Sequence, residues 1–248
     1  MIQRSDDDKR LLQLIKLTNF LSFGPETTPV DLKSLNIHIG INGVGKSNLF
    51  EAVALSRATP IDIGAVVRKG GGASEWIWKG KPDSTATIEV VVSNTKGKQP
   101  LVHLLSFYSD NGRFQVNDEK VENEHGYNEQ RPYFYYHFEG GYPIVNTNDG
   151  KRRQLARETI DPTLSILSQR RDPEQYPEIS HLADAYGKIR IYREWSFGRN
   201  TVFREPQKAD MRNDRLEEDF SNLGLFLNRI SRQHPKAKKE ILEGLSEL

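Results

Sequence analysis

The segment that most limits how this chain can fold is residues 40–47, GINGVGKS, which matches the pattern G-x-x-x-x-G-K-[ST] at every fixed position. Residues 35–41 alternate apolar with polar or small side chains and predict a buried strand before the loop. From Ser47 onward, apolar residues recur at helical spacing, and Pro60 limits this helix at its far end. Strand, glycine-rich loop and helix form the setting in which this pattern binds phosphate; the alternative is a flexible loop that matches by chance.

The residue types of the loop suit a polyphosphate ligand. Glycines permit tight turns and leave room for a close approach, and successive N–H groups can then point at an anion. The start of the following helix adds a partial positive charge. Lys46 can reach the β- and γ-phosphates, and the Ser47 hydroxyl can bind Mg²⁺. We therefore predict ATP and Mg²⁺ as cofactors, bound by Asn42, Gly43, Val44, Gly45, Lys46, Ser47 and Asn48.

Composition narrows the class of protein. The 248 residues suffice for one large domain or two small ones, and the formal net charge of +1 gives no overall attraction to nucleic acid. The chain contains no cysteine, which excludes a disulfide framework and a thiolate zinc site. The polar N-terminus lacks the apolar core of a signal peptide, and no apolar run approaches the roughly 20 residues that span a bilayer. We expect a soluble, cytoplasmic protein without a membrane partner.

The rest of the chain is first rich in strand patterns and then in helix patterns. Strands are predicted at 11–20, 86–94, 101–108, 113–117 and 132–138, with a hairpin turn at Asn111-Gly112, and residues 68–80 are predicted as a glycine-rich loop. After residue 150 we predict helices at 178–187, 214–231 and 235–248 and a strand at 188–195. This divides the chain into a nucleotide-binding core at 1–60, a β-rich subdomain at 61–150 and a helical segment at 151–248.

The stretch IKLTNFLSFGPETTPVDLKSLNIHIGINGVGKSNLFEAV resembles the N-terminal nucleotide-binding segment of ABC-type ATPases of the RecF/SMC group. The likeness includes Asn19-Phe20, the Ser22-Phe23 turn and the string G-x-N-G-x-G-K-S-N. More narrowly, RKGGGASEWIWKG and RIYREWSFGRN are similar to the bacterial AAA-family "predicted ATPase" proteins. Several relatives of that group work beside nuclease partners in phage defence.

The resemblance implies an α/β fold, namely a P-loop ABC-type ATPase head with an antiparallel β subdomain and C-terminal helices. It implies that two heads, in a homodimer or a higher oligomer, close over ATP to control DNA engagement or a partner nuclease. It also places Gln169 as a Q-loop glutamine that touches Mg²⁺ or the attacking water; the plainer interpretation is a surface glutamine at a helix end. Two other functions stay open: an ATP-dependent scaffold or sensor without turnover, and a DNA-repair clamp of RecF type.

Two motifs of an ABC-type site are missing from the sequence. No apolar strand after Ser47 ends in Asp-Glu, and no LSGG-like signature occurs. We therefore expect the chain to be the N-terminal part of a longer ATPase. By itself it should bind nucleotide but hydrolyse ATP poorly, because the carboxylates that hold metal and activate water are absent. An ordinary turnover rate of the purified chain would contradict this expectation.

Aromatic residues and histidines allow further, less specific predictions. Trp76 and Trp78 favour packing in the β-rich part over a partner contact, and the aromatic run at 132–138 favours sheet packing over base stacking. Phe20 and Phe23 are candidates to flank the adenine. The six histidines show no spacing typical of a zinc site.

Overall fold

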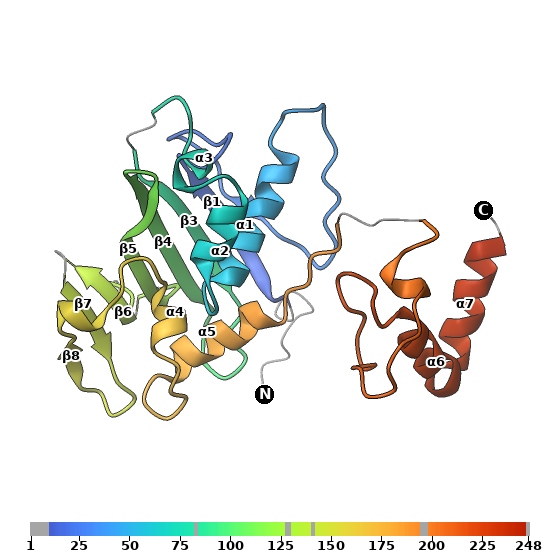
Figure 1. Ribbon diagram of the computed structural model, residues 1–248. Helices are drawn as coiled ribbons and strands as arrows, with labels where there is room; N and C mark the ends of the chain where they lie inside the picture. The colour runs from blue at the N-terminus through green and yellow to red at the C-terminus, as the bar shows by residue number, and fades with distance from the viewer. Residues whose placement is uncertain (1–9, 82–83, 127–129, 140–141, 194–197, 247–248) are drawn as a thin grey trace. The chain divides into compact units, whose positions relative to one another are not determined.

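A computed structural model describes residues 10–81, 84–126, 130–139, 142–193 and 198–246 (Figure 1). The chain divides into two compact units, Met1–Ile189 and Arg190–Leu248. The first unit combines α-helices with one antiparallel β-sheet and contains the loop at 40–47. The second contains helices α6 (Leu223–Gln233) and α7 (Pro235–Ser246), which pack on each other.

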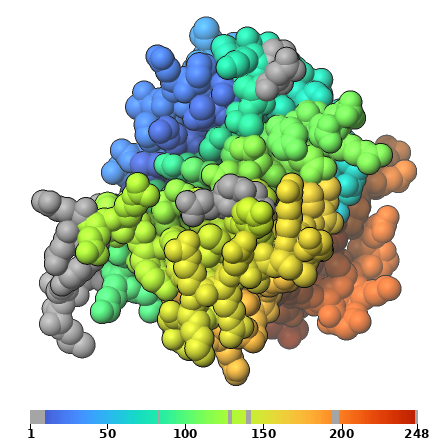
Figure 2. Space-filling model, turned by 90° about the vertical axis from the view of Figure 1, so that its left-hand side faces the viewer, coloured from blue at the N-terminus to red at the C-terminus, as the bar shows by residue number. Residues whose placement is uncertain are grey.

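The sheet of the first unit has eight strands in the order β2-β1-β3-β4-β5-β6-β7-β8, and every neighbouring pair is antiparallel. Its strands are β1 (Leu12–Thr18), β2 (Val30–Asp31), β3 (Ala86–Val92), β4 (Leu101–Asp110), β5 (Arg113–Asn123), β6 (Phe134–Glu139), β7 (Tyr142–Asn146) and β8 (Arg152–Gln154). Figure 2, which views the molecule from the side of β7 and β8, shows these strands at the surface, where the sheet ends. The predicted antiparallel β-rich part is confirmed, and β1 from the predicted core segment belongs to the same sheet.

The hairpin between β4 and β5 forms where the sequence predicts it. Asn111 and Gly112 both have positive φ, 49° and 81°, and Asp110 pairs with Arg113 across the turn. Two consecutive positive φ angles give a turn whose twist matches that of the flanking strands, and asparagine followed by glycine adopts them at the lowest cost. Local chemistry therefore fixes the register of this long strand pair.

One face of the sheet is covered by helices α1 (Lys46–Ala58), α2 (Ile63–Lys69), α4 (Ile166–Gln169) and α5 (Pro177–Gly187) (Figure 1). Along β3, Ala86, Ile88 and Val90 are buried, while the intervening Thr87 and Glu89 are partly exposed. This alternation aims one row of side chains at the helices. The core lies between these two layers.

The helix after the loop is confirmed. Helix α1 buries Leu49, Ala52 and Leu55 against the core. At its end, Thr59 donates its N–H and its hydroxyl to the Ser56 carbonyl, at 3.2 and 2.6 Å, and Pro60 follows. Proline cannot continue the helical hydrogen bonds, so the position of the helix end follows from sequence.

The predicted strand at 35–41 is wrong: these residues form no strand. The apolar side chains on its alternating positions are exposed by 75–90%, namely Leu35, Ile37, Ile39 and Ile41. A strand needs a neighbour for its N–H and C=O groups, and β1, which precedes this segment, already pairs with β2 and β3. The alternating pattern is present, but no strand among the described residues pairs with it.

Two other predictions, the strand at 188–195 and the helix at 214–231, differ from the structure. No strand forms over residues 188–193, and the rest of the predicted strand, 194–195, lies outside the described residues. The helix predicted at 214–231 begins only at Leu223, because Asn222 donates its side-chain amide to the Arg212 and Arg215 carbonyls, both at 2.7 Å, and holds a turn there. The last predicted helix is confirmed as α7.

Residues 68–80 are more ordered than predicted. They include the end of α2 and the short helix α3 (Ala73–Trp76). Trp76 is buried, and its indole N–H donates to the Val67 carbonyl at 3.2 Å. This burial confirms the predicted packing role of Trp76. The hydrogen bond satisfies the indole N–H, which needs a partner when it is buried.

Candidate phosphate-binding site

The loop at 40–47 turns through two glycines with positive φ. Gly43 has φ 84° and Gly45 has φ 95°, and Gly45 is the N-cap of α1. No side chain caps the first N–H groups of α1, and its first turn contains no acidic residue. The start of the helix therefore keeps its N–H donors and partial positive charge for an anion.

Lys46 bends back over its own loop. Its ammonium donates to the carbonyls of Gly40 and Ile41, at 2.6 and 2.7 Å. These two bonds hold a cation against the backbone of the loop. Phosphate oxygens are stronger acceptors than peptide carbonyls, so an anionic ligand could replace both partners without moving the backbone.

The turn at Ser22-Phe23 contacts the loop next to the start of α1. Asn48 donates its side-chain amide to the Ser22 hydroxyl at 2.8 Å. A Cβ on Gly45 would lie 2.8 Å from that same hydroxyl oxygen and 3.4 Å from the Phe23 ring. The turn at Ser22-Phe23 thus touches the start of α1.

The remaining predicted loop residues are open to solvent. Asn42, Val44 and Ser47 are exposed, and a Cβ built on Gly43 would meet nothing within 4 Å. These loop residues are therefore accessible, and Ser47 is exposed near the start of α1. Of the two phenylalanines considered for the adenine, Phe20 is fully buried against Trp76 and Phe107, so only Phe23 is accessible.

The side-chain hydrogen bonds of Gln169 connect it to Asp161 and Leu164, not to the loop at 40–47. Its side-chain oxygen accepts from the Asp161 N–H at 2.8 Å, and its amide donates to the Asp161 and Leu164 carbonyls at 3.1 and 3.0 Å. It therefore closes the turn at 161–169. In Figure 1, α4 lies toward the end of the sheet where α1 finishes rather than where it begins.

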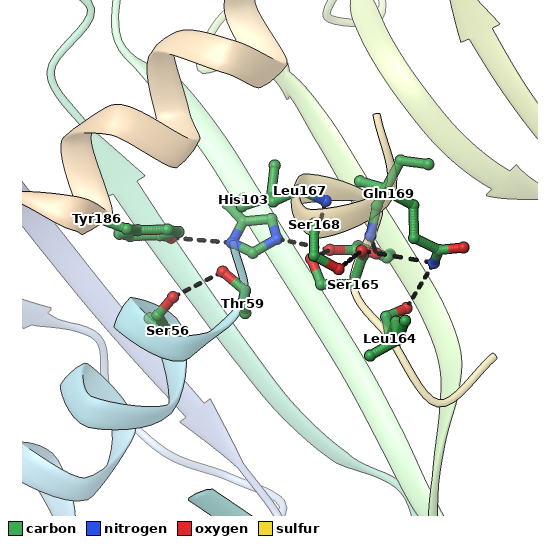
Figure 3. A network of polar contacts seen from close by, with 11 residues as sticks. Ser56, Thr59, His103, Leu164, Ser165, Leu167, Ser168, Gln169 and Tyr186 are labelled. Carbon is green, nitrogen blue, oxygen red and sulfur yellow. Dashed lines mark hydrogen bonds and ion pairs between the residues drawn. The ribbon is translucent and has the colours of Figure 1, made fainter. Parts of the chain in front are cut away.

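Sequence reasoning missed a polar cluster buried beneath the helices (Figure 3). Its members are Glu119, His103, Ser165 and Tyr186, each exposed by 2% or less. They come from β5, β4, the start of α4 and α5. Up to 83 positions separate bonded partners, so no local pattern predicts the cluster.

Within the described ranges, no group of three or more His, Cys, Asp or Glu side chains could hold a metal ion. No helix in this part of the chain is long and apolar enough to cross a membrane. A Mg²⁺ ion at the loop would have Ser47, phosphate oxygens and water as ligands, a set that Mg²⁺ accepts.

Comparison with known proteins gives no family for this chain. No family model matches the sequence, and no curated protein matches it either.

Proposed function

We propose that residues 40–47 bind the phosphates of ATP with Mg²⁺, in the nucleotide-binding head of an ATPase that resembles the RecF/SMC group. One observation supports this above the others. The Lys46 ammonium is bonded to the carbonyls of a loop in which Gly43 and Gly45 adopt positive φ, and no side chain caps the first N–H groups of the helix that follows. This combination suits a polyanion and has no evident role in stabilising the fold.

Binding would proceed by exchange of partners. The phosphates would displace the Gly40 and Ile41 carbonyls from Lys46, and the ammonium would then neutralise part of their charge. N–H groups around Gly43 and Gly45 would donate to the inner phosphates. Bound Mg²⁺ would supply further charge neutralisation between phosphates, and the Ser47 hydroxyl would be its protein ligand.

The direct test is nucleotide affinity of the Lys46→Ala variant, measured by titration calorimetry with ATP and Mg²⁺. Hydrogen bonds to charged groups contribute about 1.5–3 kcal/mol, so we expect affinity to fall by roughly 10- to 150-fold. Lys33→Ala is the matched control, because Lys33 is exposed and its loss changes the net charge equally. The proposal fails if Lys46→Ala binds ATP as tightly as the wild type, or if both variants lose affinity equally.

The wider role rests on the resemblance and is proposed with it. Two heads would associate on ATP and control DNA engagement or a partner nuclease, with a role in antiviral defence. Size-exclusion chromatography with and without ATP, Mg²⁺ and DNA separates this from a non-hydrolysing scaffold and from a repair clamp. If the chain stays monomeric with ATP bound and DNA present, pairing of heads is excluded for this chain.

The Q-loop role of Gln169 is also proposed rather than observed. Before the amide could meet Mg²⁺ or water at the loop, it would have to leave Asp161 and Leu164. The role therefore requires a rearrangement of the turn at 161–169. Gln169→Ala should lower turnover in an assembled ATPase while leaving ATP affinity of this chain nearly unchanged.

A further inference from the structure

The buried carboxylate of Glu119 anchors the start of α4. Glu119 lies on β5 and is 1% exposed. It accepts hydrogen bonds from the Ser165 hydroxyl at 2.5 Å, from the Ile166 N–H at 2.7 Å and from His103 Nε2 at 3.1 Å. Burying a carboxylate is costly unless donors satisfy it, and three donors do so here. The beginning of α4 is therefore tied to the middle of the sheet.

The same cluster reaches α5, the helix that packs on α1 after the phosphate-binding loop. His103 Nδ1 lies 2.9 Å from the Tyr186 hydroxyl of α5. With Nε2–H donating to Glu119, Nδ1 is left to accept the phenolic proton of Tyr186. Burial raises the pKa of Tyr186, so the phenol keeps the proton that it donates.

These contacts join two places that matter to the proposed function. Ser56 follows Lys46 by ten residues along α1, which corresponds to about 15 Å of continuous helix. At the other end, Ile166 is three residues before Gln169. In Figure 3 the dashed lines run from Tyr186 to His103 and on toward the start of α4, whereas Ser56 of α1 is joined to Thr59. A shift of α1 would reach this chain through the packing of α5 on α1, and it would strain hydrogen bonds between buried polar atoms.

We infer that Glu119 is a positioning residue that couples α1 to the turn at 161–169 through His103 and Tyr186, so that nucleotide binding at the loop changes the stability of that turn. The inference rests on the proposed nucleotide binding. It differs from a purely structural role because it requires a response of the turn to ligand. A fully satisfied polar network suits such coupling, since it specifies one arrangement of the elements that it joins.

Hydrogen exchange of the full chain, with and without ATP and Mg²⁺, tests the coupling. In the wild type we expect nucleotide to change exchange rates of the amides at 166–170 by about threefold or more. Tyr186→Phe should keep ATP affinity within about twofold and lose most of this response. Tyr135→Phe is the control, because it removes another 2.9 Å tyrosine hydrogen bond, to Asn123, outside the cluster.

A double-mutant cycle tests the network without nucleotide. Glu119→Gln and Tyr186→Phe both act on His103, so their combined effect on the unfolding constant should differ from the product of the single effects by about threefold or more. Glu119→Gln with Tyr135→Phe should be multiplicative within about twofold. If the effects of Glu119→Gln and Tyr186→Phe on the unfolding constant multiply, the two residues are not coupled through His103, and the inference fails.

The outcomes of the two experiments separate the inference from the proposed function. If the wild type binds no nucleotide, both fall. If it binds nucleotide and exchange at 166–170 does not respond, or responds equally in Tyr186→Phe, the inference fails while the proposed function stands. Loss of the response in Tyr186→Phe alone, with a coupled cycle, supports it.

Discussion

Replacing Gly45 by alanine should destabilise the protein more than the same change at Gly43, for a reason visible in the loop. Both glycines have positive φ, which costs a residue with a side chain about 1–2 kcal/mol. At Gly43 the new methyl group would meet nothing within 4 Å, so this conformational cost is the whole effect. Gly43→Ala thus serves as the matched control.

At Gly45 the methyl group would also collide with the supporting turn. It would lie 2.8 Å from the Ser22 hydroxyl oxygen, which Asn48 also uses as its acceptor. Ser22 can move away only by giving up that hydrogen bond, which contributes about 1 kcal/mol. We therefore expect a total loss of about 2–3 kcal/mol for Gly45→Ala.

Urea unfolding followed by circular dichroism would measure both variants. A difference of about 1 kcal/mol is expected between them, with equal slopes against urea. Adding Ser22→Ala to Gly45→Ala should reduce the difference, because the smaller side chain removes the collision. Equal losses for Gly43→Ala and Gly45→Ala would refute the argument that the Ser22 turn supports the loop.

Two further predictions concern exposure and charge. Ile39→Lys should change the free energy of unfolding by less than about 0.5 kcal/mol, because Ile39 is 90% exposed. By contrast, Ile88→Ala in the core should cost about 2–5 kcal/mol in the same urea titration. A loss above about 2 kcal/mol for Ile39→Lys would mean that the segment at 35–41 is buried after all. Burial raises the pKa of Asp118 above its ordinary 3.8, although His137 and Lys120 oppose this, and its Oδ1 has no hydrogen-bond partner. The folded state therefore favours protonated Asp118, and this stability is present below pH 3.8 and lost as pH rises through the folded-state pKa. Asp118→Asn should stabilise the protein at pH 7 and not at pH 3, as thermal unfolding at the two pH values would show.

Much of the local structure could be predicted because its causes lie within a few residues. The Asn111-Gly112 turn needs only two residues that tolerate positive φ, and the end of α1 needs only Pro60. The loop at 40–47 is equally local, since its glycines and Lys46 act on neighbouring atoms. These features follow from backbone conformational preferences and hold in many surroundings.

Other predictions depended on partners that the sequence does not name. The pattern at 35–41 is that of a strand, yet strand formation requires a neighbour, and the described residues provide none. Likewise, α6 begins at Leu223 and not at the predicted residue 214, because the Asn222 side-chain amide donates to carbonyls seven and ten residues earlier. In the first case a pairing partner is missing among the described residues, and in the second case bonds to carbonyls further back in the chain override the local helix pattern.

The amino-acid sequence by itself determined the glycine turns of the loop, the hairpin and the end of α1, because each arises from short-range conformational preferences. Only the tertiary structure decided that Gln169 closes its own turn and that Glu119, His103 and Tyr186 meet beneath the helices. Buried polar groups must find partners wherever the fold brings them, and the partners of Glu119 lie 16 and 46 positions away. Such pairings depend on how the layers pack, which no local pattern encodes.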